Sequence, residues 1–261
     1  MIVINDIDDE RISFYRSLRY TPKSHIENRV FVAEEEKVVL KLLHSELEVV
    51  SIFACSEYIE RYIDLIRKKH IPDNQIFTAD KALMKKIVGY RLHSGFMAIG
   101  RQPDNVETDK LNRPLIILNA LANAENVGSI VRNAAAFGFQ SIIYDEATVS
   151  PYLRRSVRVS MGNVFHLDIS YSNSVINTIK ELKAKNIKIV AIEICNDSVS
   201  LNTFNPVNKN YALIFGSEGE GINQEVLGLA DTILHIPISP NVASLNVASS
   251  SAIVLKEFSQ L

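Results

Sequence analysis

Residues 211–255, YALIFGSEGEGINQEVLGLADTILHIPISPNVASLNVASSSAIVL, decide the fold that we expect for this chain. One apolar run, 212–215, breaks into a glycine-rich segment, and a second, 233–238, breaks into a polar stretch before a helix begins. This pattern predicts two buried strands that end in two loops. The glycines let the first loop offer N–H groups to a ligand at close range, whereas Glu218 and Glu220 disfavour a polyphosphate.

The glycine-rich segment has the spacing G-x-x-G-x-G over residues 216–221. It matches neither the G-x-G-x-x-G of dinucleotide-binding folds nor the G-x-x-x-x-G-K-[ST] of phosphate-binding loops. Taken alone, it is equally compatible with a loop that only reverses the chain. If it binds a ligand, one with a cationic or hydrogen-bond-donating part fits its carboxylates best.

The composition bounds the class of protein. The chain has 261 residues, 47% of them hydrophobic, which suffices for one large or two ordinary domains, and its net charge of −2 confines any nucleic-acid surface to a local patch. Cys55 and Cys195 stand far apart without clustered histidines, so we expect no metal, no disulfide framework and a reducing compartment. Because no apolar run approaches the roughly 18 residues of a membrane helix, we expect a soluble, cytoplasmic protein that makes no membrane contact.

Residues 1–101 predict a small α/β domain, followed by a polar linker over 102–113 with Pro103 inside it. Residues 17–28, which include Pro22, are expected to form a polar, basic connection. The expected strands are 29–33, 49–55, a strand starting near 76, and 96–100. The expected helices are 8–18, 34–45, 58–70 and 80–87.

Residues 114–261 alternate between near-continuous apolar runs and helical stretches. Such alternation predicts an α/β fold with a parallel sheet covered on both faces, in which ligands bind beyond the carboxyl ends of the strands. The expected strands are 115–118, 141–144, 164–169, 187–194, 212–215 and 233–238. The expected helices are 126–137, 154–161, 174–186 and a final helix after residue 246.

An arginine occupies the otherwise small and apolar helix within NAENVGSIVRNAAAFG, residues 123–138. Asn126 can cap this helix, and Arg132 follows about one and a half turns later. Because arginine is rarely buried without a partner, we expect Arg132 to face a cleft, a carboxylate or a phosphate. Simple solvent exposure is the alternative.

Two further clusters leave alternatives open. Arg154, Arg155 and Arg158 spread over one side of a helix, where they suit either phosphate binding or a solvated surface. Ser244 or Asn246 can cap the final helix. Small residues at 248–252 let another backbone pack closely on that helix, as at a tight subunit interface or where chain passes through chain.

Three motifs in order and register resemble the SpoU-type, TrmH-like RNA 2′-O-methyltransferases of the SPOUT superfamily. They are NAENVGSIVRNAAAFGF at 123–139, LIFGSEGEGI at 213–222 and HIPISPNVASLNVASSSAIVL at 235–255, and the resemblance extends over 115–261. It implies an α/β domain over 114–261 whose C-terminal segment is threaded as a trefoil knot, a rare exception to unknotted topology. It also implies a homodimer formed through the knotted domain.

The resemblance also implies a cofactor, a substrate and a set of site residues. S-adenosylmethionine would be held by Gly216, Ile236 and Leu245 with Ser244 nearby. The substrate would be RNA, either rRNA, which is favoured, or tRNA, methylated on a ribose 2′-hydroxyl. The implied catalytic residues are Arg132, Asn126, Glu218, Ser244 and Asn246.

The first half is similar to the RNA substrate-binding domain of that family. The family's stretch of phenylalanine, small apolar residues, Glu-Gly, any residue and lysine occurs here as FVAEEEKV, residues 31–38. Glu35 replaces the expected glycine, so the local turn and any RNA contact there are open.

Two other functions are alternatives. A class I methyltransferase would carry its glycine-rich loop after the first strand, but residues 119–126 contain no glycine. A catalytically silent RNA-binding or ribosome-assembly factor on the same scaffold is the other alternative. Retention of Asn126, Arg132, Glu218 and Asn246 together argues against it.

Overall fold

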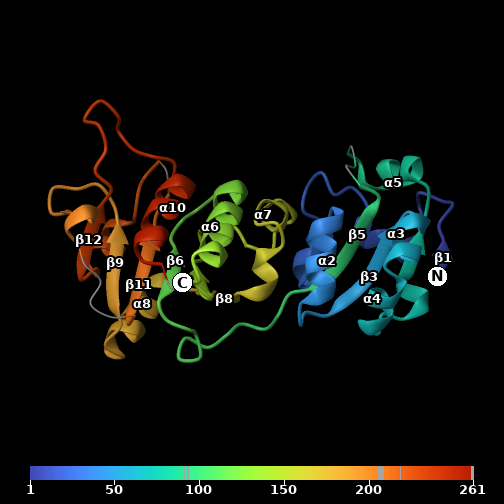
Figure 1. Ribbon diagram of the computed structural model, residues 1–261, viewed down its shortest axis with the longest axis horizontal. Helices are drawn as coiled ribbons and strands as arrows, with labels where there is room; N and C mark the ends of the chain where they lie inside the picture. The colour runs from blue at the N-terminus through green and yellow to red at the C-terminus, as the bar shows by residue number, and fades with distance from the viewer. Residues whose placement is uncertain (91, 93, 205–208, 218, 260–261) are drawn as a thin grey trace. The chain divides into compact units, whose positions relative to one another are not determined.

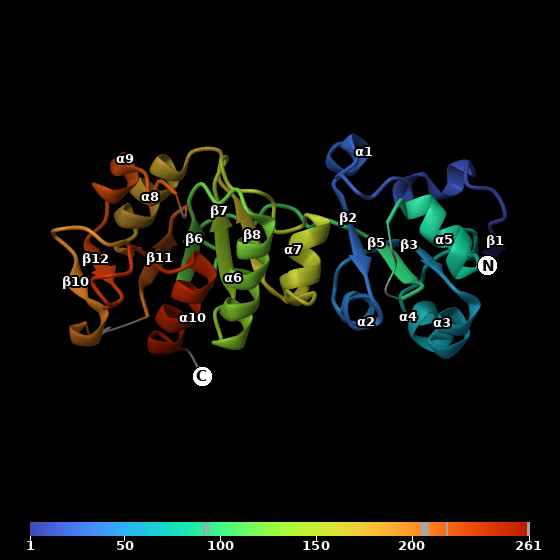
Figure 2. The ribbon, with the colours of Figure 1, turned by 90° about the horizontal axis from the view of Figure 1, so that it is seen from above.

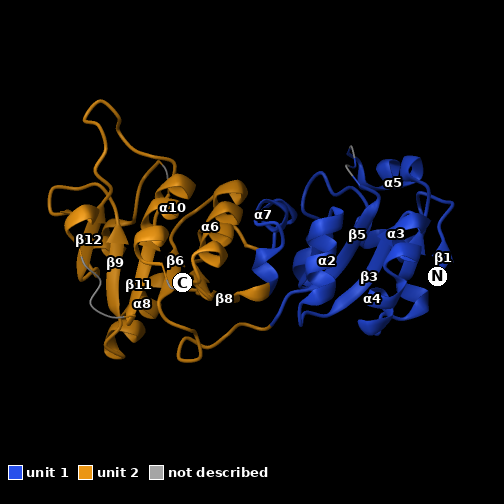
Figure 3. Ribbon diagram, in the orientation of Figure 1, with its two compact units in different colours: residues 1–103, 152–165 blue, residues 104–151, 166–261 orange. Residues whose placement is uncertain are grey.

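The computed structural model describes residues 1–261 except 91, 93, 205–208, 218 and 260–261 (Figure 1). The described residues form two compact units (Figure 3). Unit 1 contains residues 1–103 and 152–165, and unit 2 contains residues 104–151 and 166–261. The chain therefore leaves unit 2 after Pro151, contributes a short segment to unit 1, and returns at His166.

Unit 1 contains a five-stranded mixed sheet with the strand order β1-β4-β3-β5-β2. The strands β1, β4 and β3 run parallel, and β5 is antiparallel to β3 and β2. The strands are β1 Ile2–Val3, β2 Val30–Glu34, β3 Val49–Ala54, β4 Ile76–Thr78 and β5 Phe96–Arg101. The α-helices are α1 Lys23–Glu27, α2 Glu36–His44, α3 Ser56–Arg61, α4 Ile63–Lys68, α5 Lys81–Val88 and α7 Arg154–Val159.

Three details of unit 1 differ from the sequence-based expectations. The expected helix 58–70 is two helices, because Tyr62 leaves helical geometry at φ −114° and ψ 18° between α3 and α4. The expected connection 17–28 contains α1. The expected helix 8–18 shrinks to a 3₁₀ segment, Glu10–Tyr15. Such errors arise where local signals are short, and helix boundaries are the least certain feature of any sequence pattern.

Residue 35 preserves the turn expected of a glycine. Glu35 lies between β2 and α2 with φ 75° and ψ 144°, a conformation that non-glycine residues rarely adopt. The chain therefore makes the turn from strand to helix although the glycine is absent.

Aromatic contacts fix the 152–165 segment within unit 1. The ring of Phe31, on β2, lies 5.4 Å from the ring of Tyr152 and 5.1 Å from that of Phe165, centroid to centroid. Phe31 is 1% exposed and Phe165 is 5% exposed. Burial of these rings supplies a large apolar contact between β2 and residues distant in sequence.

Unit 2 contains a seven-stranded, wholly parallel sheet with the order β10-β12-β9-β11-β6-β7-β8. Helices cover both faces, and α6 and α10 lie side by side on one of them (Figures 1 and 2). The strands are β6 Leu115–Leu118, β7 Ser141–Tyr144, β8 Asp168–Tyr171, β9 Lys188–Ile192, β10 Val199–Ser200, β11 Tyr211–Phe215 and β12 Thr232–His235. The α-helices are α6 Ala124–Ala136, α8 Val175–Ala184, α9 Gln224–Leu227 and α10 Val247–Glu257.

The register of the central strands explains where the loops meet. β6 lies between β11 and β7, with Leu118 opposite Phe215 and Tyr144. All four residues of β6 are fully buried, as the continuous apolar run predicted. Because the strands are parallel, the segments that follow β9, β11 and β12 emerge at one edge of the sheet.

One expected strand of this half is misplaced. The apolar run 164–169 does not form one strand: Asn163–His166 is a 3₁₀ segment, and β8 begins only at Asp168. Val164 and Phe165 are buried within unit 1 instead. No α-helix among the described residues is both long and apolar enough to span a membrane.

Candidate active site

The glycine-rich loop follows β11 directly and closes on itself. Ser217 and Gly221 exchange two backbone hydrogen bonds, of 3.2 and 3.1 Å, and the Glu220 N–H donates to the Ser217 hydroxyl over 3.2 Å. Gly221 has φ 71°, in the region that favours glycine. A Cβ atom on Gly216 would lie 2.6 Å from the backbone nitrogen of Ile222. Both positions therefore require glycine for this loop shape.

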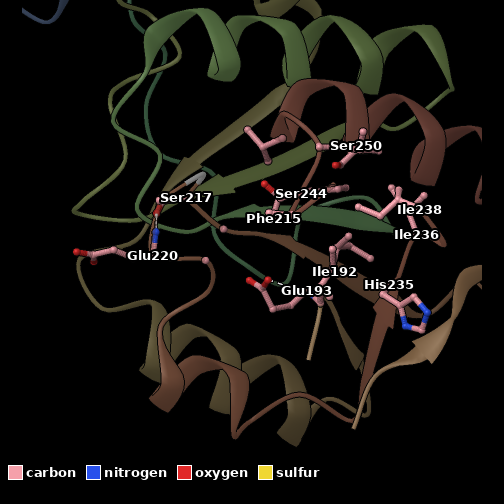
Figure 4. Close-up of a pocket in the computed structure, with 17 residues that line it drawn as sticks. Ile192, Glu193, Phe215, Ser217, Glu220, His235, Ile236, Ile238, Ser244 and Ser250 are labelled. Carbon is pink, nitrogen blue, oxygen red and sulfur yellow. Dashed lines mark hydrogen bonds between the residues drawn. The ribbon is translucent and has the colours of Figure 1, made fainter. Parts of the chain in front are cut away.

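A cavity of about 360 Å³ lies beside this loop (Figure 4). The ends of β9, β11 and β12 and the segment that precedes α10 form its walls. The four residues predicted to contact a cofactor, Gly216, Ile236, Ser244 and Leu245, all line it. The structure thus brings together four positions spread over 30 residues of chain, at the sheet edge where parallel α/β folds bind ligands.

The cavity wall combines apolar side chains with carboxylates. Ile192, Phe215 and Ile238 supply apolar surface, and Glu193 and Glu220 supply negative charge. None of the described residues that line the cavity is lysine or arginine. The volume is in the range of small-molecule sites, and the charge suits a ligand with a positive centre.

Glu193 was not predicted from the sequence. Its carboxylate accepts hydrogen bonds from the backbone N–H groups of Ile222, at 2.9 Å, and Ile194, at 3.0 Å. It lies immediately after β9, and only that position at a strand end distinguishes it in the sequence.

The predicted catalytic residues divide into two groups. Ser244 lines the cavity, whereas Asn126, Arg132 and Asn246 do not. Asn246 donates from Nδ2 to Oδ1 of Asn126 over 3.1 Å, which joins α10 to the first turn of α6. Glu218 falls outside the described residues.

Arg132 projects from α6 and is exposed. It forms no hydrogen bond or ion pair with any other residue within the described part of the chain. The solvent-exposed alternative left open by the sequence therefore holds for the isolated chain. An exposed guanidinium on an otherwise small or apolar helix is available to a second molecule.

The helix caps resolve two open assignments. Asn123, not Asn126, caps α6, because its side chain accepts from the Glu125 N–H. Asn246, not Ser244, caps α10 by accepting from the N–H groups of Ala248 and Ser249. Asn126 is 6% exposed, and its side-chain oxygen accepts from Asn246 instead. Its prediction as a cap was therefore wrong.

The α6–α10 contact uses the small residues of the final helix. Asn133 donates from Nδ2 to the Ala248 carbonyl at 3.0 Å and to the Ser251 hydroxyl at 2.9 Å. Ser251 is fully buried. The close packing expected for residues 248–252 thus occurs against α6 within the chain.

A buried carboxylate that the sequence analysis missed supports the loop before α6. Asp145, 2% exposed, accepts from the Asn119 side chain at 2.6 Å, the Ala120 N–H at 3.1 Å and the Thr148 hydroxyl at 2.6 Å. Asn119 in turn accepts from the Asn223 N–H at 3.2 Å. This network links the ends of β6 and β7 to the segment that follows the glycine loop. In the sequence, only the position of Asn119 and Asp145 directly after the apolar strands β6 and β7 indicated this network.

The arginine cluster of α7 has a protein partner. Arg154 donates from Nη1 to both carboxylate oxygens of Glu34, at 2.9 and 3.0 Å, and Arg158 lies 3.5 Å from the same carboxylate. Glu34 is 5% exposed, and the Arg154 guanidinium also lies over the Tyr90 ring, 4.3 Å from its centroid. Burial, together with the charge of Glu34, raises the pKa of Tyr90. Neither the phosphate-binding nor the solvated alternative describes Arg154, which is an ion-pair partner inside unit 1.

Metal chemistry receives no support from side-chain clustering. Among the described residues, no group of three or more histidine, cysteine, aspartate or glutamate side chains could hold a metal ion. Cys55 and Cys195 are free.

Comparison with known proteins identifies the family. The family described as SpoU rRNA Methylase matches residues 113–256, which span all three motifs quoted above. This chain belongs to the SpoU rRNA methylase family. The matched segment contains Arg132, the glycine loop and the cavity-lining residues of the final loop.

Individual relatives of this SpoU-family chain match over different lengths. An uncharacterized tRNA/rRNA methyltransferase of Mycobacterium tuberculosis is 26% identical over 260 residues, which cover 97% of this chain and 89% of that protein. The 23S rRNA (guanosine(2553)-2′-O)-methyltransferase of Bacillus subtilis is 27% identical over 143 residues, 55% of this chain and 56% of that protein. The crystal structure of AdoMet-bound rRNA methyltransferase from Sinorhizobium meliloti has a TM-score of 0.86 at 23% identity, and covers 98% of this chain and 96% of that one. At that identity the structural match establishes the fold.

Proposed function

We propose that this protein transfers a methyl group from S-adenosylmethionine to a ribose 2′-hydroxyl of RNA, with rRNA favoured over tRNA. The observation that carries the proposal is the convergence of Gly216, Ile236, Ser244 and Leu245 on one cavity. Family membership supports methyl transfer to RNA. The 2′-O activity in the name of the B. subtilis relative supports the ribose as target, and the AdoMet-bound S. meliloti structure supports the cofactor.

The cavity suits S-adenosylmethionine in its chemistry. Its apolar residues offer a surface for an adenine ring, and the half-buried carboxylate of Glu193 complements a sulfonium. Bound there, the cofactor supplies an electrophilic methyl group. In this proposal Gly216, Ile236 and Leu245 hold it through backbone atoms, with Ser244 beside them.

Arg132 takes the substrate-facing role in the proposal. A ribose hydroxyl is a weak nucleophile that must lose its proton as it attacks, so stabilisation of the developing alkoxide and grip on a neighbouring phosphate accelerate the reaction. Arginine stays protonated in water, which favours this electrostatic role over that of a base. Asn126, Asn246 and Glu218 would orient Arg132 or the ribose.

We further propose a homodimer formed through unit 2 and a trefoil knot in its C-terminal segment. Arg132 is not among the described residues that line its own chain's cavity. A dimer would allow Arg132 of one subunit to face the cavity of the other, so that each active site draws on both chains. Sedimentation measurements of the purified protein would test the oligomeric state.

The competing function is a catalytically silent RNA-binding or ribosome-assembly factor. Calorimetry with S-adenosylmethionine, followed by transfer of a labelled methyl group to rRNA and tRNA fractions, separates the two. Alkali resistance of the labelled dinucleotide then identifies a 2′-O-methyl group, because methylation removes the hydroxyl that cleaves the adjacent phosphodiester. The proposed function would be overturned if the protein showed no measurable affinity for the cofactor and methylated neither RNA.

A further inference from the structure

Glu193 lies where three cavity walls meet. Its backbone N–H donates to the Leu234 carbonyl of β12 over 2.9 Å, and its carboxylate accepts from the Ile222 N–H behind the glycine loop. The same carboxylate accepts from Ile194, the next residue in the chain. The residue thus joins the end of β9 to the neighbouring strand and to the loop after β11.

The carboxylate fits the glycine loop at close range. A Cβ atom placed on Gly221 would lie 2.4 Å from Oε2 of Glu193, so the carboxylate fills the space that any side chain at 221 would require. Because two backbone N–H groups hold it, the negative charge stays fixed in the wall of the cavity.

The two carboxylates of the wall differ in orientation. Figure 4 shows the Glu193 carboxylate directed toward the glycine loop and that of Glu220 pointing outward. Glu193 is half-buried, whereas Glu220 is exposed. Solvent and salt screen an exposed charge far more than a half-buried one, so of these two carboxylates Glu193 attracts a cation in the cavity with less screening.

We propose that Glu193 is a specificity-determining residue that makes the cavity prefer the sulfonium of S-adenosylmethionine to the neutral thioether of S-adenosylhomocysteine. This inference rests on the proposed function. In methyl transfer the ribose oxygen bonds to the methyl carbon, the sulfur–methyl bond breaks with its electron pair left on sulfur, and the hydroxyl proton passes to solvent water. S-adenosylhomocysteine, the spent cofactor, therefore lacks the positive charge that Glu193 attracts. This difference favours release of S-adenosylhomocysteine over release of S-adenosylmethionine.

Calorimetry with both ligands on the full-length wild type and three variants tests the proposal. Glu193→Gln removes the charge with little change in size, Glu193→Asp keeps the charge, and Glu220→Gln removes the exposed charge of the same wall. We expect wild type to bind S-adenosylmethionine more tightly than S-adenosylhomocysteine. Glu193→Gln should weaken the binding of S-adenosylmethionine about tenfold and that of S-adenosylhomocysteine less than about twofold.

The two other variants separate charge from loop packing. Glu193→Asp shortens the side chain and should weaken the binding of both ligands, but the preference for the positively charged S-adenosylmethionine should remain. Glu220→Gln should change the ratio of the two affinities by less than about twofold. Thermal unfolding of each variant checks that it folds.

Two results would overturn the inference while the proposed function stands. One is an equal loss of affinity for both ligands in Glu193→Gln, which would show that Glu193 has a purely structural role. The other is a wild-type protein that binds S-adenosylhomocysteine at least as tightly as S-adenosylmethionine, a measurement that needs no folded variant. Wild type that binds neither ligand would instead remove the proposed function itself.

Discussion

Asn246 donates a hydrogen bond to Asn126 over 3.1 Å, although 120 residues separate them. The same Asn246 side chain accepts from the N–H groups of Ala248, at 2.9 Å, and Ser249, at 3.3 Å. One amide therefore begins α10 with its oxygen and fastens α6 with its nitrogen. This side chain, together with Asn133, therefore links the helix that carries Arg132 to the helix that follows the cavity wall.

Asn246→Ala should lower the free energy of unfolding by about 1–2 kcal/mol, because α10 loses its cap and Asn126 is left with an unpaired oxygen. Asn246→Ser retains a capping oxygen but cannot reach Asn126, so it should cost less. Urea unfolding followed by circular dichroism measures both. Equal losses in the two variants would show that the link to Asn126, and not the cap, supplies the stability.

Arg132→Ala should reduce methyl transfer at least about a hundredfold, as expected when a group that stabilises developing negative charge is removed. The affinity for S-adenosylmethionine should stay within about twofold, because Arg132 is not among the described cavity-lining residues. Its exposed position predicts no loss of thermal stability. Single-turnover assays measure the rate of methyl transfer, and calorimetry measures the affinity for S-adenosylmethionine. Wild-type turnover with normal cofactor binding would refute the assignment of Arg132.

Gly216→Ala and Gly219→Ala form a matched pair in one loop. A Cβ atom on Gly216 meets the Ile222 nitrogen at 2.6 Å, whereas one on Gly219 meets nothing within 4 Å. Gly216→Ala should therefore displace the loop and weaken S-adenosylmethionine binding more than about tenfold, and Gly219→Ala should weaken it far less. Calorimetry on both variants decides the matter. Similar affinities would mean that the loop shape at Gly216 does not govern binding.

The strands β6, β7 and β11 of unit 2 were predictable from sequence because each lies in a largely buried, mainly apolar run. β6 and β7 match their predicted ranges, and β11 differs by one residue at its start. The prediction of a strand at 164–169 was wrong because apolar residues indicate burial but not the unit in which they are buried. Val164 and Phe165 pack within unit 1, and no local pattern contains that information.

The site was predictable where a motif marks it and unpredictable where tertiary pairing decides. The glycine loop and residues 236–245 were found through sequence motifs. The role of Arg154 was not, because Glu34, its partner, stands 120 residues earlier in the chain. Glu193 carries no motif at all. Its importance arises from two backbone N–H groups that only the folded chain presents to it.

The unfolding free energy should fall in mild acid because of His25. This ring is 4% exposed, and its Nε2 donates to the Phe14 carbonyl over 2.8 Å. Burial lowers the pKa of His25 below its ordinary value of 6.5, against a smaller opposing effect of the bond to Phe14. The unfolded chain therefore binds a proton more readily than the folded chain, so stability is complete above pH 6.5 and decreases as pH falls below it.

His25→Gln removes the titrating group and keeps a donor side chain. The stability difference between wild type and this variant should therefore shrink as the pH is lowered from 7.5 to 5. Urea unfolding at the two pH values measures that difference. A difference that is constant, or that grows in acid, would contradict a neutral buried His25.

Glu35→Gly should raise the free energy of unfolding, against the usual direction of substitution. Glu35 adopts φ 75° and ψ 144° at the turn from β2 into α2, a conformation that costs a non-glycine residue about 1–3 kcal/mol. Glycine removes this strain but adds about 0.5–1 kcal/mol of entropy to the unfolded chain, which leaves a net gain of about 1 kcal/mol. Glu35→Ala has the same strain and serves as the control, with no comparable gain expected. Urea unfolding compares the three proteins, and a Gly variant no more stable than the Ala variant would show that the strain at residue 35 is relieved elsewhere.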